Sequence, residues 1–144
     1  MLVSDVLNHK GPEVVRVLAT DTVMSAVRKL SERRIGAVVV EDQWMKLVGI
    51  FSERDLLNAV ARGGPHALDR RVEELMTTHV ITCRSSDRVE AVMALMTMQR
   101  IRHLPVVDDG ALKGMISIGD LVKVRLDEKE LEANTLREIS RMRA

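Results

Sequence analysis

Residues 101–121 read IRHLPVVDDGALKGMISIGDL, and residues 35–56 read IGAVVVEDQWMKLVGIFSERDL. Both stretches contain an apolar run, a polar turn, a second apolar run with a glycine, and then a serine that precedes Asp-Leu. Three residues of the stretch 35–56 return 65 positions later in the stretch 101–121: Gly49, Ser52 and Asp55 recur as Gly114, Ser117 and Asp120. An internal repeat decides an architecture before any single motif is weighed. The chain therefore consists of two related halves.

The repeat extends upstream of both stretches. Asp21-Thr22-Val23 matches Asp87-Arg88-Val89 at an offset of 66, and residues 3–7 resemble residues 72–76. Apolar residues recur at i, i+3, i+4 and i+7 after each of these aspartates, which is typical of an amphipathic helix. We expect Asp21 and Asp87 to cap these helices. Each half has roughly 60 residues, too few to bury a good core alone.

Each half is predicted to run β-α-β-β-α. Each amphipathic helix is followed by an apolar run rich in Val or Ile, a polar turn and a second short apolar run, which indicates two strands joined by a hairpin. The closing helix of the first half is expected from Arg54 to Arg62 and ends at Gly63-Gly64-Pro65. The second closing helix is expected to begin near Asp120. We divide the chain into residues 1–66, residues 67–128 and a helical C-terminal segment, residues 129–144, which is either a solvated tail or a packing surface.

Composition excludes several classes of protein. The 144 residues are 46% hydrophobic and 30% charged, with a net charge of +1 from interspersed acidic and basic residues. This balance argues against nucleic-acid and membrane-surface binding, and Trp44 and Phe51, the only aromatic residues, provide no stacking platform. No apolar run approaches the roughly 20 residues of a membrane span, so a cytoplasmic protein is expected. A single cysteine, Cys83, forms no internal disulfide, and the four histidines outline no metal site.

The Ser117–Asp120 motif has the chemistry of a nucleotide site. A strand that ends at Ser117 and a helix that starts near Asp120 present unpaired N–H groups and a positive dipole to an anion. A carboxylate at the same edge can accept hydrogen bonds from both hydroxyls of a ribose, although an Asp there can also be a plain helix cap. In the first half, Ser52 and Asp55 match, and Arg54 is either a counter-charge for phosphate or a solvated residue.

The residues at the start of each hairpin differ between the two halves. Pro105 lacks an N–H, which implies either an edge position or a disrupted strand ladder, and Arg102 and His103 bring cations to the start of this strand. The histidine is either a ligand contact or a structural residue. The first half has Gly36-Ala37-Val38 in place of Arg102-His103-Leu104. We therefore rank the second half as the more complete site.

The two copies together resemble the cystathionine-β-synthase (CBS) domain, written in tandem as in a Bateman module, over residues 3–126. The resemblance implies a mixed α/β (α+β) fold of two β-α-β-β-α units with pseudo-two-fold symmetry around a central cleft. It also implies adenosine sites in which the Asp binds ribose, the Ser lies near phosphate, and a Thr, here Thr82, contacts ribose or base; Arg16 replaces this Thr in the first half. The candidate ligand-binding residues are Thr82, Arg102, His103, Leu104, Pro105, Ser117, Ile118 and Asp120 in the second half, and Arg16, Gly36, Val38, Ser52, Arg54 and Asp55 in the first.

The predicted function is a stand-alone regulatory module that binds an adenine nucleotide and modulates a separate effector protein. AMP or ATP is favoured because basic residues suit phosphate, while NAD and S-adenosylmethionine stay open. The resemblance also implies a homodimer. Catalysis has little support: no phosphate loop, zinc motif or serine elbow occurs, and Cys83 with His79 or His103 is a weak nucleophile-base pair. The main alternative is a constitutive protein-interaction module with vestigial nucleotide sites.

Overall fold

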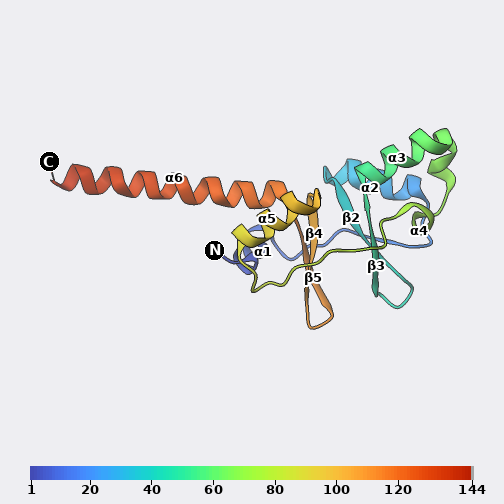
Figure 1. The fold of residues 1–144 in the computed structure, drawn as a ribbon, viewed down its shortest axis with the longest axis horizontal. Coiled ribbons are helices and arrows are strands. Elements are labelled where there is room, and N and C mark those ends of the chain that lie inside the picture. The colour runs from blue at the N-terminus through green and yellow to red at the C-terminus, as the bar shows by residue number, and fades with distance from the viewer. Residues whose placement is uncertain (144) are drawn as a thin grey trace.

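The computed structural model describes residues 1–143, and Figure 1 shows two small sheets with helices packed on them and one long helix that extends from the second half. The elements are α1 (Val3–Lys10), β1 (Arg16–Leu18), α2 (Val23–Arg33), β2 (Ala37–Glu41), β3 (Leu47–Ser52), α3 (Glu53–Gly63), a 3₁₀ helix (Gly64–Asp69), α4 (Val72–Leu75), α5 (Val89–Gln99), β4 (His103–Asp108), β5 (Ala111–Ser117) and α6 (Ile118–Arg143). The predicted mixed fold of two repeated units is confirmed.

Each half is built on an antiparallel hairpin, β2–β3 or β4–β5. The second hairpin turns at Asp109 and Gly110, with φ of 49° and 80°, as a tight turn between twisted strands requires. The registers pair Ala37 with Ser52 and His103 with Ser117. Each motif serine therefore lies beside the first residue of its own hairpin.

The first strand of the repeat differs between the halves. β1 pairs in parallel with β2 to give a three-stranded sheet, whereas the strand expected around Val80-Ile81-Thr82 is reduced to one parallel bridge between Cys83 and Val106. Both halves therefore begin with a helix, α1 or α4, that the predicted β-α-β-β-α order lacks, and the second half, within residues 1–143, also lacks a first strand.

The predicted helix caps are wrong at Asp21 and Asp87. Thr22 caps α2 by accepting a hydrogen bond from Ser25 N, and α5 has no side-chain cap. Asp21 and Asp87 instead accept hydrogen bonds from the backbone N–H groups three residues before them, at 2.9 and 2.8 Å. Each aspartate therefore stabilises the turn that precedes its helix and not the first turn of the helix.

The leading helices pack across the repeat. Val3 and Val6 of α1 belong to the core of the second half, and Val72 of α4 belongs to the core of the first. Backbone hydrogen bonds join the same segments: Val3 N donates to Asp87 O and Val72 N donates to Asp21 O, at 2.9 and 2.8 Å. Each spatial unit therefore contains a helix from the neighbouring stretch of sequence, which ties the two halves together.

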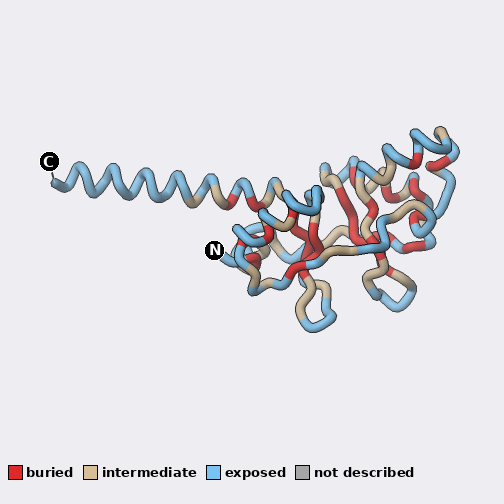
Figure 2. Tube along the Cα trace, in the orientation of Figure 1, coloured by how far each residue is buried: buried red, intermediate tan, exposed pale blue. Residues whose placement is uncertain are grey.

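A third apolar cluster joins the two sheets. Ala37, Val39 and Met115 are buried in it, and Ile50 and Leu112 pack against it. Figure 2 shows buried segments concentrated in the hairpins and the inner sides of the helices, while almost all of α6 beyond the body is exposed. The joined sheets place the end of β3 close to the start of β4, and Ser52 and His103 line the same cavity.

Candidate functional site

The Ser52–Asp55 motif lies where β3 ends and α3 begins. Ser52 N donates to Asp55 Oδ2 at 2.9 Å, and Asp55 N donates to Ser52 Oγ at 3.3 Å. This reciprocal capping fixes the carboxylate at the positive end of the helix. The second carboxylate oxygen, Oδ1, accepts a hydrogen bond from Thr77 Oγ1 at 2.9 Å. Thr77 follows α4, so the exchanged helix also positions the motif.

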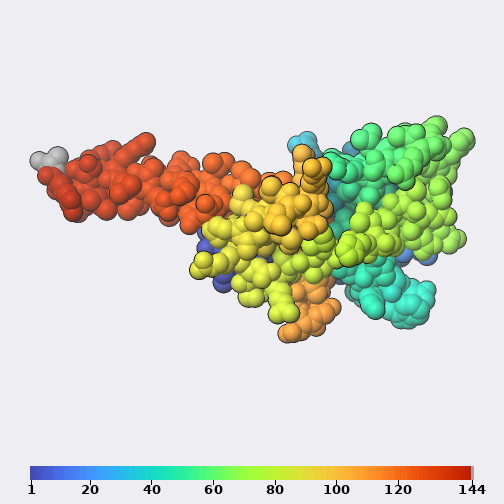
Figure 3. Space-filling view, viewed as in Figure 1, coloured from blue at the N-terminus to red at the C-terminus, as the bar shows by residue number. Residues whose placement is uncertain are grey.

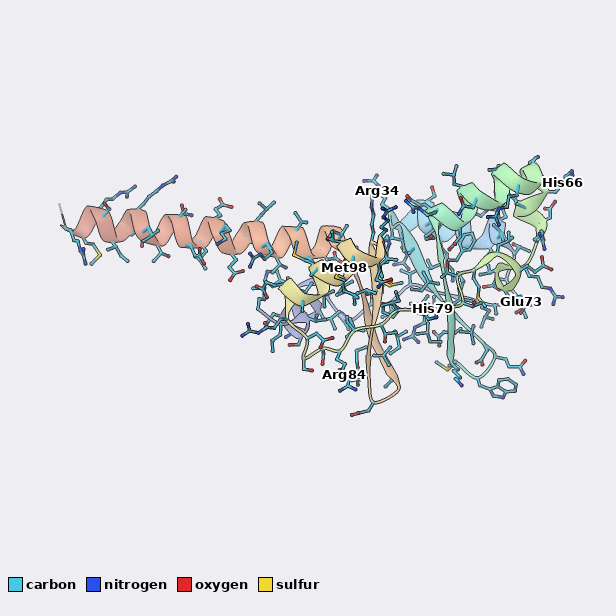
Figure 4. The ribbon with its side chains drawn as sticks, in the orientation of Figure 1. Arg34, His66, Glu73, His79, Arg84 and Met98 are labelled. Carbon is cyan, nitrogen blue, oxygen red and sulfur yellow. The ribbon has the colours of Figure 1, made fainter. Side chains whose placement is uncertain are left out.

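A cavity of about 390 Å³ opens beside Asp55. Its walls come from both halves: the end of β3 and the start of α3, the segment after α4, and the segment between α5 and β4. His79 lies on the segment that crosses from the first half to the second (Figure 4). The lining residues are Gly36, Ala37, Ile50, Ser52, Glu53, Arg54, Asp55, Leu57, Thr77, His79, Val80, Ile81, Arg100, Ile101, Arg102 and His103.

The cavity collects six of the fourteen residues predicted from the sequence: Gly36, Ser52, Arg54, Asp55, Arg102 and His103. The cations of the second half thus face the acidic motif of the first. The predicted site did not include the other lining residues, which are Ala37, Ile50, Glu53, Leu57, Thr77, His79, Val80, Ile81, Arg100 and Ile101. The signal available for Thr77 is a hydroxyl side chain directly after the leading helix, but the repeat is recognisable only over residues 72–76, which end before it.

Three arginines give the cavity a basic side. Arg54, Arg100 and Arg102 are exposed, and none of them forms an ion pair with a carboxylate among residues 1–143. The same three also line an adjoining open hollow of about 400 Å³ with Ile118. Unpaired guanidinium groups at a helix N-terminus match the oxygens of a phosphate.

His103 lies between the two halves. Its Cε1 atom is 3.0 Å from the point where a Cβ on Gly36 would stand, so a side chain at position 36 would require the imidazole to shift. Burial lowers the pKa of His103, Lys10 and Arg102 lower it further, and Glu53 and Asp120 oppose them. The imidazole is therefore neutral near pH 7 and can donate or accept one hydrogen bond.

The matching motif of the second half is occupied from within the chain. Ser117 N donates to Asp120 Oδ2 at 2.9 Å, as in the first half, but Lys10 Nζ also donates to Asp120 Oδ2 at 2.8 Å and to Met115 O at 2.7 Å. Burial raises the pKa of Asp120, yet the bonds from Lys10 and Ser117 outweigh burial and hold it below its ordinary value. The helix here begins at Ile118, so Asp120 is its third residue and not its cap.

Lys10 reaches Asp120 because α1 is longer than its counterpart. α1 continues to Lys10, whereas α4 ends at Leu75, directly before the segment that holds Thr77. An ammonium group therefore bonds to the second motif where a threonine hydroxyl bonds to the first. No sequence pattern predicts this pair, because its members are 110 residues apart.

The other predicted residues lie outside the cavity. Val38, Leu104 and Pro105 are buried, and Thr82 is exposed. Arg16 Nε forms an ion pair of 3.0 Å with Glu41, whose side chain is 7% exposed. Ile118 lines only the adjoining hollow, and Ser117 and Asp120 line neither space.

Cys83 is not placed as a nucleophile. It is buried, and burial raises its pKa to about 12, with smaller contributions from Asp87 and Asp108. A thiol with this pKa stays protonated near neutral pH. Within residues 1–143, no group of three His, Cys, Asp or Glu side chains is arranged to hold a metal ion, and no helix has the length and apolar character to cross a bilayer.

The molecule is thus a tandem pair of related α/β units that form one cavity between them. The chain belongs to the CBS domain family, which it matches over residues 3–62 and 72–127. It is 34% identical over 142 residues to the CBS domain-containing protein CBSX3, mitochondrial, of Arabidopsis thaliana, covering 93% of this chain and 69% of that protein. It is 43% identical to a CBS-domain containing protein of Agrobacterium tumefaciens with a TM-score of 0.84, covering 86% of this chain and 92% of that one. The resemblance noted from the sequence is confirmed.

Two similar structures contain adenosine ligands. A CBS domain protein from Pyrobaculum aerophilum, complexed with AMP, is 31% identical with a TM-score of 0.74, covering 83% of this chain and 89% of that one. The CBS domain pair of protein MJ0100, in complex with 5′-methylthioadenosine and S-adenosyl-L-methionine, is 27% identical with a TM-score of 0.78, covering 89% of this chain and 98% of that one. The ligands of these two CBS domain proteins share an adenosine group.

Proposed function

We propose that this chain is a regulatory module that binds an adenine nucleotide, AMP or ATP, in the cavity beside Asp55. The observation that carries the proposal is the cavity of about 390 Å³, in which one motif carboxylate faces three unpaired arginines. This volume lies within the range of about 300–1,000 Å³ that is typical of small-molecule sites. Two similar proteins with adenosine ligands support the same class of ligand.

The proposed pose assigns a role to each wall. Asp55 accepts hydrogen bonds from the ribose hydroxyls, because a carboxylate retains acceptor capacity beyond its bonds to Ser52 and Thr77. The adenine ring lies against Ile50 and Val80 beside Gly36. The phosphates meet Ser52, the α3 N-terminus, His103 and the arginines 54, 100 and 102.

Charge favours a phosphate-bearing ligand. Arginines 54, 100 and 102 attract phosphate and repel the sulfonium of S-adenosylmethionine, while 5′-methylthioadenosine makes no use of them.

The ranking from the sequence placed the principal site at Asp120. We now assign it to Asp55, because Lys10 bonds to Asp120. The proposed second site at Thr82, Leu104, Pro105, Ser117, Ile118 and Asp120 is closed while this pair holds.

We further propose that the module is not an enzyme, acts as a homodimer and regulates a separate effector protein. Nucleotide binding acts on the effector only through different affinities for two arrangements of the module, and the cavity walls from both halves provide such a coupling. The cytoplasmic location stays a prediction from the sequence. The Lys10–Asp120 pair favours a second candidate, a constitutive interaction module whose nucleotide sites have been lost.

Calorimetry tests the proposal. Protein stripped of bound nucleotide is titrated with AMP, ATP, NADH and S-adenosylmethionine, in the wild type and in the matched variants Asp55→Asn and Asp120→Asn. We expect AMP or ATP to bind, and Asp55→Asn to weaken binding about 100-fold, because two charge-assisted hydrogen bonds are lost. Asp120→Asn is expected to bind like the wild type. Loss of binding only in Asp120→Asn would place the site in the second half, and no heat with any ligand would favour the interaction module.

A further inference from the structure

α6 extends well beyond the body of the protein. Leu121 and Val124 pack in the core of the second half, and among residues 1–143 the ion pair of 3.0 Å between Arg125 and Glu90 is the last side-chain ion pair of α6 with another element. Figures 1 and 3 show the rest of the helix projecting away from both halves. Residues 127–143 span about 25 Å at 1.5 Å per residue. A solvated helix of this length is marginally stable alone.

The apolar face of the projecting part continues the face that packs in the core. At about 100° per residue, Leu131, Ile139 and Met142 fall within roughly 80° of Leu121 and Val124 around the helix axis. These three side chains are 67%, 43% and 85% exposed. We call Leu131, Ile139 and Met142 the α6 stripe. The same sequence pattern that anchors the helix in the core therefore runs on without a partner.

Charges are segregated along the projecting part. Residues 127–132 carry four acidic side chains and one lysine, whereas residues 137–143 carry three arginines and one glutamate. Two such helices side by side in parallel bring like charges together. In antiparallel order, each acidic segment lies against a basic one.

We propose that α6 pairs in antiparallel order with α6 of a second copy of this chain, stripe against stripe. A pairing centred at Thr135 places Leu131 of one copy opposite Ile139 of the other and residue 127 opposite residue 143. The projecting part of each helix is then covered along its whole length, and each helix ends where the body of the other copy begins. The inference supplies a surface for the homodimer proposed above and does not depend on the ligand.

Sedimentation and cysteine cross-linking test this pairing. The double variant Leu131→Asp/Ile139→Asp is expected to weaken dimerisation by on the order of 100-fold or more, because it buries charge in an apolar contact. Leu126→Asp is the matched control, since Leu126 is 64% exposed and lies about 140° from Leu121 around the helix. The control is expected to dimerise like the wild type.

Cross-linking reports on the helix itself. Chains with Leu131→Cys are mixed with chains that carry Ile139→Cys and then oxidised; buried Cys83 does not compete. We expect disulfides in the mixture and none in Leu131→Cys alone. Cross-linking of Leu131→Cys to itself would overturn the antiparallel order. A wild-type dimer without any cross-link would overturn pairing through α6 while leaving the homodimer in place, and a wild type that is monomeric at all concentrations would overturn both.

Discussion

Removal of Lys10 is expected to open the second motif. Lys10 Nζ bonds to Asp120 Oδ2 at 2.8 Å, and the two side chains keep 34% and 26% of their surface exposed. A hydrogen bond to a charged group contributes about 1.5–3 kcal/mol when buried, and an exposed ion pair about 0.2–1 kcal/mol. At this intermediate exposure we take about 1–2 kcal/mol. A ligand that competes with Lys10 for Asp120 therefore binds about 5- to 30-fold more weakly.

The variant Lys10→Ala removes this competition and the aliphatic chain that fills the site. We expect AMP to bind the wild type once per chain and Lys10→Ala twice, measured as calorimetric stoichiometry. Lys29→Ala is the matched control, because Lys29 also donates to a backbone carbonyl, Arg16 O at 2.6 Å, but does not contact Asp120. A folded Lys10→Ala protein that still binds one AMP per chain would refute the reasoning.

Three further predictions concern packing and pH. A Cβ on Gly49 would lie 2.8 Å from the carbonyl oxygen of Thr77, whereas a Cβ on Gly114 would meet only a flexible leucine side chain. Gly49→Ala is therefore expected to lower the free energy of unfolding by about 1–3 kcal/mol in chemical denaturation, and Gly114→Ala by less. Equal losses in the two variants would contradict this. The pKa of Asp120 in the folded chain lies below its ordinary value of 3.8, because burial, which raises it, is outweighed by the bonds from Lys10 and Ser117. Its carboxylate therefore stabilises the folded chain fully above pH 3.8, and this contribution is lost as the pH falls through the lowered pKa. The difference in unfolding free energy between the wild type and Asp120→Asn should shrink over the same pH range. The pKa of His103 lies below its ordinary value, chiefly because of burial, and the negative charge of a bound phosphate is expected to raise it. Nucleotide affinity should therefore increase from pH 8 to pH 6 and lose this increase in His103→Gln, which calorimetry at both pH values checks.

The repeat in the sequence predicted most of the secondary structure. The helices at Val23 and Val89 and both hairpins follow from periodicity and turn residues, which act over a few neighbouring positions. Periodicity marks the apolar face of a helix without marking the core it faces. The exchange of α1 and α4 between the halves was therefore not predicted, although Val3 and Val72 carry the pattern that drives it.

The candidate site was predicted less well because it is made by contacts between distant residues. The chemistry of Asp55 and Asp120 is identical in the sequence, and the cations near Arg102 favoured the second half. In the folded chain, Arg102 and His103 face the cavity of the first motif. The two motifs differ mainly through Lys10, whose position at the end of α1 follows from one extra helical turn.

The close approach of His103 to Gly36 makes the contact between the halves depend on a difference between them. Position 36 of the first half corresponds to Arg102 in the second half, and position 37 corresponds to His103, so two identical halves would place an arginine beside His103 where the chain has a glycine. A Cβ at position 36 would already lie 3.0 Å from His103 Cε1, so the imidazole would have to shift to admit any side chain there. One half therefore contributes the imidazole, and the other contributes the open space beside it.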